Sequence, residues 1–233
     1  MHSRISPRAA LAAAASICLA CMMALAPQAA TDVGTKMVAA RQANAALLKQ
    51  YQWNCRTEIY MDNQLKDTRV EQLAYGVDGS LMRTELSNTT SHLPIGFLRR
   101  AIAQGQLQKI EHFMTGLRGL MQKYTEMTPP QIDAFMAKAA VSSVTAPDGT
   151  ALMKLSATNV IEPGDSVDLW VDTAKHQWHK IVIATTFEKE KATVTASYKT
   201  NKAGLDYMTM AQIEVPSQKA TLMLHNYDFQ TTD

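Results

Sequence analysis

Few residues of this chain have the types and spacing that chemistry at a protein site requires. His176 and His179 stand three residues apart in a polar turn, and Asp172 precedes them, so a metal site is conceivable there. Such spacing in a loop is weakly diagnostic, and neither a cysteine pair nor an H-E-x-x-H helix supports it. We therefore expect solvent-exposed polar side chains in this turn, and no metal ion.

Motifs for nucleophilic, phosphoryl-transfer or dinucleotide chemistry are absent, because the sequence contains no G-x-S-x-G, no P-loop and no G-x-G-x-x-G. Cys55 alternates in register with Trp53 and Ile59, which predicts a buried and inert thiol. The carboxylates of the predicted strands are expected to face solvent, namely Glu58, Glu71, Glu85 and Asp168. These patterns predict a protein that is not an enzyme and needs no cofactor.

The first thirty residues have the features of a secretory signal peptide. Arg4 and Arg8 precede an almost wholly apolar run over residues 9–26, and "ALAPQAA" ends in small residues. We expect cleavage, a single domain over residues 31–233 and a periplasmic location. Anchoring through a lipid on Cys21 is not expected, since the apolar "MMALA" continues beyond that cysteine.

Charge restricts the class of partner. Two of the 23 basic residues and none of the 21 acidic residues lie in residues 1–30, so the rest of the chain is formally neutral. Nucleic acids and anionic membrane surfaces attract proteins that carry a strong basic excess. We therefore expect no nucleic-acid partner, and we expect a monomer.

Hydrophobic periodicity predicts a definite order of elements. A helix is expected over residues 32–50, strands over 52–61, 65–75 and 81–86, a helix from about 97 to 127, and another helix capped by Thr128. Seven more strands follow, and in the hairpin "SVDLWVDTAKHQWHKIVIAT" alternation places Trp170 and Trp178 on the polar side, whereas Trp53 is on a dry face. About ten antiparallel strands with helices inserted in one block predict an α+β fold with a strongly curved sheet wrapped round helices.

This order, together with "LWVDTAKHQWHKIVI", "ASYKTNKAGLDYMTMAQIEV" and "HNYDF", resembles the bacterial lipoprotein carriers LolA and LolB and the related sensor-binding protein RseB. The resemblance implies an unclosed β-barrel in which an inserted helical lid covers an apolar cavity for acyl chains. Such carriers usually place an arginine–proline pair before the third strand, and this pair is absent from "AYGVDGSLMRTEL". No ligand-gating role is therefore assigned to Arg56, Arg69 or Arg83.

The methionines are compatible with such a cavity. Eleven of the 14 follow residue 30, and several are on elements predicted to face inward. The flexible thioether suits a surface that accepts ligands of variable shape, but it also fills irregular gaps in an ordinary core. The predicted cavity residues are Trp53, Ile59, Met61, Met82, Phe113, Met114, Leu117, Met121, Met136, Met208 and Met210.

These observations predict an exported binding protein that holds a lipid or the acyl chains of a lipoprotein. The alternative is a periplasmic sensor or interaction protein of the same fold, which binds a protein partner through a sheet edge or through its helices. A continuous void between sheet and helices favours the first function, and a filled core favours the second. A membrane or protein partner is compatible with both.

The signal-peptide prediction has a direct test. We expect cleavage between Ala26 and Thr31, because small residues there suit signal peptidases. The intact mass of the exported protein measures this. A product that retains residues 1–20, or that carries a diacylglyceryl adduct on Cys21, would contradict it.

Overall fold

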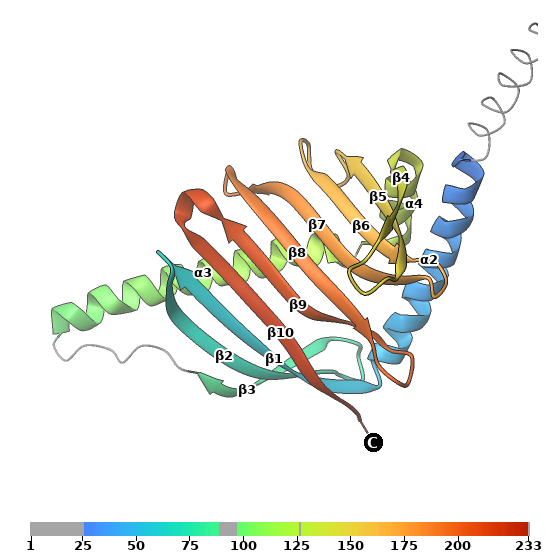
Figure 1. The fold of residues 1–233 in the computed structure, drawn as a ribbon. Coiled ribbons are helices and arrows are strands. Elements are labelled where there is room, and N and C mark those ends of the chain that lie inside the picture. The colour runs from blue at the N-terminus through green and yellow to red at the C-terminus, as the bar shows by residue number, and fades with distance from the viewer. Residues whose placement is uncertain (1–25, 89–96, 126, 233) are drawn as a thin grey trace, which may run out of the picture.

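The computed structural model describes residues 26–88, 97–125 and 127–232 (Figure 1). The predicted signal sequence up to residue 25, with Cys18 and Cys21, lies outside the described residues. The same holds for the side chains of residues 26–33 and of most of 97–110.

The described strands form a single antiparallel sheet of ten strands in the order β3-β2-β1-β10-β9-β8-β7-β6-β5-β4. They are β1 (Tyr51–Met61), β2 (Gln64–Tyr75), β3 (Leu81–Asn88), β4 (Ala140–Thr145), β5 (Ala151–Thr158), β6 (Ser166–Asp172), β7 (Gln177–Phe187), β8 (Glu190–Thr200), β9 (Asp206–Val215) and β10 (Ala220–Thr231). The last strand pairs with the first, so β10 joins the N-terminal meander to the other strands. Since β3 and β4 do not pair, the sheet stays open. The predicted α+β fold with a curved, unclosed sheet is confirmed (Figure 1).

Three helices lie on one face of the sheet, which we call the inner face (Figure 1). They are α2 (Ala26–Leu48), α3 (Phe97–Thr125) and α4 (Pro129–Lys138), and a short 3-10 turn, η1 (Pro216–Gln218), precedes β10. The predicted N-terminal helix is present but begins earlier, at Ala26. The predicted start of α4 is confirmed, because the Gln131 side chain accepts a hydrogen bond of 2.8 Å from the Thr128 N–H.

The apolar stripe of α3 buries against the inner face of the sheet. Phe113, Leu117 and Tyr124 are each at most 6% exposed and belong to one core cluster with residues of β5 to β8. Burial of such side chains stabilises the fold by about 1.5–3 kcal/mol each. The helix is continuous despite its glycines, and Gly116 has a packing role, because a Cβ there would lie 2.8 Å from the Phe187 ring.

A buried hydrogen-bond network holds the C-terminal end of α3. The Tyr124 hydroxyl donates to Asp165 Oδ2 at 2.8 Å, and the same carboxylate accepts the backbone N–H groups of Val160, Ile161 and Glu162. Burial by itself raises the pKa of Asp165, but these donors outweigh it, so the pKa is lowered. The end of α3 is therefore anchored to the loop between β5 and β6.

The prediction that Trp178 lies on the polar side of its hairpin is wrong. Trp178 is 4% exposed and packs edge-on against Tyr198, whereas Trp170 is partly exposed beside Lys154. The β6–β7 register passes from Trp170↔Lys180 to Val171↔Trp178 and leaves His179 unpaired. This bulge moves Trp178 to the inner face, because one extra residue exchanges the faces of a strand.

Gly116 and Gly119 form a matched pair for testing the packing of α3. Gly116→Ala should lower the free energy of unfolding by about 1–3 kcal/mol, because the new methyl group overlaps the Phe187 ring. Gly119→Ala meets nothing within 4 Å and should raise it by up to about 1 kcal/mol through helix propensity. Urea denaturation of both variants measures this, and equal effects would show that α3 does not pack as described.

Candidate functional site

A cavity of about 640 Å³ lies between the inner face of the sheet and the helices. Its walls come from α2, the C-terminal end of α3, the start of α4, β1 to β3 and β8 to β10. The volume is within the roughly 300–1,000 Å³ typical of small-molecule sites. The cavity reaches the surface at β3, where its lining residues Leu81 and Arg83 are exposed, and also between the helices, where the exposed lining residues are Gln42, Ala45, Gln122 and Pro129.

Most of the cavity wall is apolar. An aromatic cluster forms one part, in which the Phe229 ring stacks on Trp53 at 5.5 Å and contacts Tyr207 at 4.3 Å between ring centroids. Tyr75 meets the other edge of this cluster, 6.1 Å from Trp53. The aliphatic lining residues are Val38, Leu48, Leu73, Leu81, Met121, Met127, Ile132, Met208 and Leu224. Such a surface can hold a hydrocarbon chain but offers it few polar partners.

The structure places the predicted cavity residues in three different surroundings. Trp53, Met121 and Met208 line the cavity. Six others belong to or pack against the hydrophobic core without lining it, namely Ile59, Met61, Phe113, Met114, Leu117 and Met136. Met82 is 52% exposed on the edge strand, and Met210 lies on the face opposite the buried Ala211. A bulge in β9 explains the last difference, since it turns Met208 inward and leaves Met210 outward.

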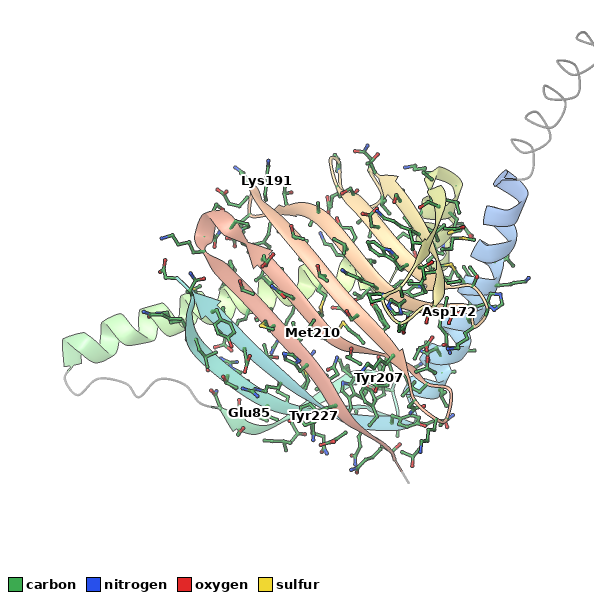
Figure 2. All side chains as sticks on the ribbon, viewed as in Figure 1. Glu85, Asp172, Lys191, Tyr207, Met210 and Tyr227 are labelled. Atoms are coloured by element: carbon green, nitrogen blue, oxygen red, sulfur yellow. The ribbon has the colours of Figure 1, made fainter. Side chains whose placement is uncertain are left out.

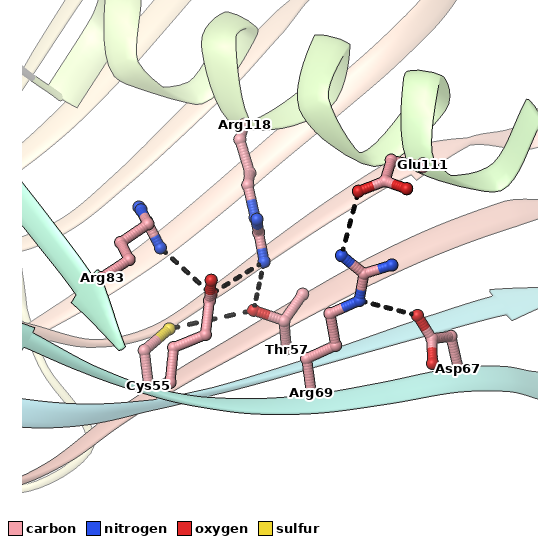
Figure 3. A network of polar contacts seen from close by, with 8 residues as sticks. Cys55, Thr57, Asp67, Arg69, Arg83, Glu111 and Arg118 are labelled. Carbon is pink, nitrogen blue, oxygen red and sulfur yellow. Dashed lines mark hydrogen bonds and ion pairs between the residues drawn. The ribbon is translucent and has the colours of Figure 1, made fainter. Parts of the chain in front are cut away.

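The polar part of the wall includes three arginines together with Gln42, Asn44, Gln122, Thr125, Asp206 and Asn226. Arg118 on α3 donates from Nη2 to Thr57 Oγ1 at 3.0 Å and to Glu71 Oε2 at 3.2 Å (Figure 3). Arg83 on β3 donates from Nη1 to the same Glu71 oxygen at 3.1 Å. Arg118 and Arg83 both line the cavity, and the network links α3 to strands β1, β2 and β3.

A neighbouring ion-pair network lies outside the cavity. Arg69 donates to Asp67 Oδ2 at 3.1 Å and to Glu111 Oε1 at 3.3 Å (Figure 3). Glu111 and Arg118 are seven residues apart, two helical turns, so both lie on the same side of α3. Glu111 and Arg118 therefore form a charged edge of α3 toward β1 and β2, next to the buried apolar stripe that includes Met114 and Leu117.

Two residues of α2 hold this helix beside the cavity. Arg41 donates to the Thr125 carbonyl oxygen at 3.0 Å, and its guanidinium lies 4.3 Å above the centre of the Trp178 ring. Asn44 forms two hydrogen bonds with the backbone of Asp206, at 2.7 and 2.8 Å, at the start of β9. These polar contacts fix α2 without filling the space between it and the sheet.

Two of the predicted solvent-facing carboxylates do not face solvent. Glu58 is 7% exposed and pairs with Arg56, and Glu71 lies on the inner face beneath α3. Cys55, in contrast, is buried on the same face as Trp53, as predicted. Glu85 is exposed and Asp168 is partly exposed on their strands. Alternation alone does not predict that Glu71 lies on the inner face, because its ion-pair partner, Arg118, belongs to a different element.

The turn that carries His176 and His179 was considered above as a metal site. No group of three His, Cys, Asp or Glu side chains in the described part of the chain could hold a metal ion. Asp172 caps its own turn by accepting the N–H groups of Ala174 and Lys175, and the two histidines of the turn are partly exposed. Burial raises the pKa of the Cys55 thiol, which reduces the fraction of reactive thiolate.

The chain matches no protein-family model and no curated protein. Among solved structures, it is similar to a DUF1329 family protein from Desulfovibrio piger, with 8% identity over 88% of this chain and 92% of that chain and a TM-score of 0.40. It is similar to a LolA superfamily protein from Nitrosomonas europaea, with 12% identity over 86% of this chain and 94% of that chain and a TM-score of 0.39. It is also similar to a putative outer membrane lipoprotein-sorting protein domain from Vibrio parahaemolyticus, with 11% identity over 85% of this chain and 93% of that chain and a TM-score of 0.35. All three likenesses are distant, with identities of 8–12%.

Among the described helices, none combines the length and the apolar character that crossing a membrane requires.

The buried thiol gives a test of the cavity wall. Cys55 is 2% exposed and lines the cavity, and its pKa is raised, so reaction of the folded protein with a thiol reagent should be much slower than reaction in urea. We expect the modification rate in the folded protein to be at least about a hundredfold lower than in urea, because the thiol must first become exposed by local opening. Spectroscopic detection of thiol modification over time measures it. Equal rates would show that Cys55 is accessible and that this wall is open.

Proposed function

We propose that this protein is an exported, non-enzymatic binding protein that holds a lipid, or the acyl chains of a lipoprotein, between its sheet and its helices. The cavity supports this most strongly. It has an apolar lining, lies against three separate helices and reaches the surface beside β3. A hydrocarbon chain that enters it leaves water, which is favourable by about 25 cal/mol per Å² of apolar surface.

The contacts around the cavity support entry and release of a ligand. Polar groups join α3 to β1, β2 and β3, whereas apolar groups join it to β7. The Arg69–Glu111 pair is partly exposed and contributes little to stability, whereas the Arg118–Glu71 pair is largely buried, so the β1–β3 side separates from α3 when an incoming polar group replaces the buried pair. We propose this side as the entrance, and the periplasm as the location.

A protein partner is the alternative, and one observation favours it. β3 is an edge strand, and all its side chains are exposed, including the apolar Met82 and Leu86. Exposed edge strands can accept a strand of another protein. An acylated lipoprotein would combine both functions, with its chains in the cavity and its polypeptide against β3.

The cavity function is testable with two alanines of α2. Ala45 lines the cavity and Ala46 does not, and both are exposed, so a larger side chain is tolerated at either position. Ala45→Trp should weaken binding of a fluorescent fatty-acyl probe about tenfold or more, because the indole occupies the space of the chain. Ala46→Trp should bind as the wild type does.

Fluorescence titration of the wild type and both variants measures this. Saturable binding that Ala45→Trp reduces and Ala46→Trp leaves unchanged agrees with the proposal. Absence of saturable binding of acyl probes, phospholipids and lipopeptides to the wild type would contradict it, and so would equal binding by all three proteins.

A further inference from the structure

We propose that the cavity selects an amphiphile with an anionic head group, a carboxylate or a phosphate monoester, that binds Arg83 and Arg118 beside Glu71. This inference rests on the proposed function, because the hydrocarbon chain of such a ligand lies in the apolar part of the same cavity.

The charges around the cavity favour an anion. Arg41, Arg83 and Arg118 line it, and Asp206 is its only carboxylate lining residue in the described part of the chain. Glu71, which bonds to Arg83 and Arg118, is the second carboxylate in contact with these arginines. Three positive and two negative charges leave one positive charge uncompensated beside an apolar wall. A ligand with one negative charge would neutralise it.

Arg83 and Arg118 have N–H groups that could donate further hydrogen bonds to an anion. A guanidinium can bind a carboxylate or phosphate through two parallel N–H groups. Here a single oxygen, Oε2 of Glu71, accepts from both arginines, and each uses one terminal nitrogen for it. Nε of Arg118 is buried and has no hydrogen-bond partner among the described residues. An anion with two or three oxygens can pair with both guanidiniums.

Burial agrees with this arrangement. The Arg118 side chain is 20% exposed, and Glu71 is 13% exposed, so the pair is largely removed from water. Burial lowers the pKa of Arg118, and the nearby Glu71 raises it by less. The Arg118 charge is therefore not fully compensated in the structure as it stands, and a second anionic group would compensate it.

Position also favours the head group at this end of the cavity. Arg83 is exposed on β3, next to the exposed Leu81, and both line the cavity where it reaches the surface. The aromatic cluster of Trp53 and Phe229 lines another part of it. A ligand can therefore place its charge near solvent at Arg83 and Arg118, and its hydrocarbon against the apolar wall.

The experiment compares three probes of equal chain length: palmitate, hexadecanol and palmitoyl lysophosphatidate. Binding to the wild-type protein is measured by displacement of a fluorescent acyl probe. We expect one or both anionic probes to bind at least about tenfold more tightly than hexadecanol, since charged hydrogen bonds are involved. The anionic probe that binds more tightly identifies the head group as carboxylate or phosphate.

Variants separate head-group recognition from an effect on the fold. Arg118→Met should weaken anionic probes about tenfold and leave hexadecanol unchanged. Arg69→Met is the matched control, because Arg69 also joins α3 to the sheet but does not line the cavity, and it should leave all three probes unchanged. Glu71→Gln should tighten anionic binding by about threefold or more, because it removes the competing carboxylate.

The outcomes are distinguishable. If no probe binds the wild type, the proposed function fails, and this inference fails with it. If all three probes bind alike, or if Arg118→Met and Arg69→Met weaken binding alike, the cavity function stands and head-group recognition is overturned. A loss of anionic binding in Glu71→Gln would likewise overturn it, because a purely structural role of Glu71 predicts loss and the proposal predicts gain.

Discussion

A single open sheet must bury one apolar face, and the way this chain meets that requirement determines the rest of the structure. Ten strands present a continuous inner face, and only three described helices lie over it. Where α3 crosses β7, the two surfaces pack closely, and Gly116 allows the Phe187 ring to contact the helix backbone. The cavity lies where α2, the C-terminal part of α3 and the start of α4 face β1 to β3 and β8 to β10. The unfilled space is thus a consequence of a sheet wider than its cover.

The two sides of α3 have different chemistry, and this difference links the fold to its proposed function. The side that carries Phe113 and Leu117 is buried in the core, whereas the side that carries Glu111 and Arg118 meets β1 to β3 through charged groups. The outer face of the sheet carries partly exposed side chains, among them the labelled Met210 in Figure 2. Movement of β1–β3 away from α3 would break the partly exposed Arg69–Glu111 pair at little cost and the largely buried Arg118–Glu71 pair at a higher cost, while the core on β7 stays packed.

Much of the architecture could be predicted from the sequence, because it depends on local patterns. Alternation over residues 52–61, Asp-Gly turns and the Thr128 start signal are each set by neighbouring residues, and the strand count and curved antiparallel sheet followed from them. The open form of the sheet was implied by the resemblance to the lipoprotein carriers. Trp178 and Met210 could not be placed, because a bulge at His179 and another in β9 exchange the faces of the residues on either side of them. Alternation carries no information about such insertions.

The polar part of the site was also beyond local patterns. Arg118 follows the buried Leu117 on α3, and only the packing of α3 over β2 brings it to Glu71, 47 residues earlier in the chain. Glu71 was expected in solvent because alternation cannot show that a guanidinium from another element covers it. One signal was available: Glu111 and Arg118 are spaced by two helical turns, which indicates a charged side on a helix whose apolar stripe is otherwise wide. The methionines, in contrast, did not distinguish the cavity from the core, because they are found in both.

The central claim, that the space between sheet and helices holds an acyl chain, is tested most directly by native mass spectrometry of the protein purified from its own cells without detergent. The account predicts a complex heavier than the polypeptide, which loses a lipid or acylated peptide on denaturation. Polypeptide mass alone, persisting after incubation with a lipid extract of the same cells, would contradict it.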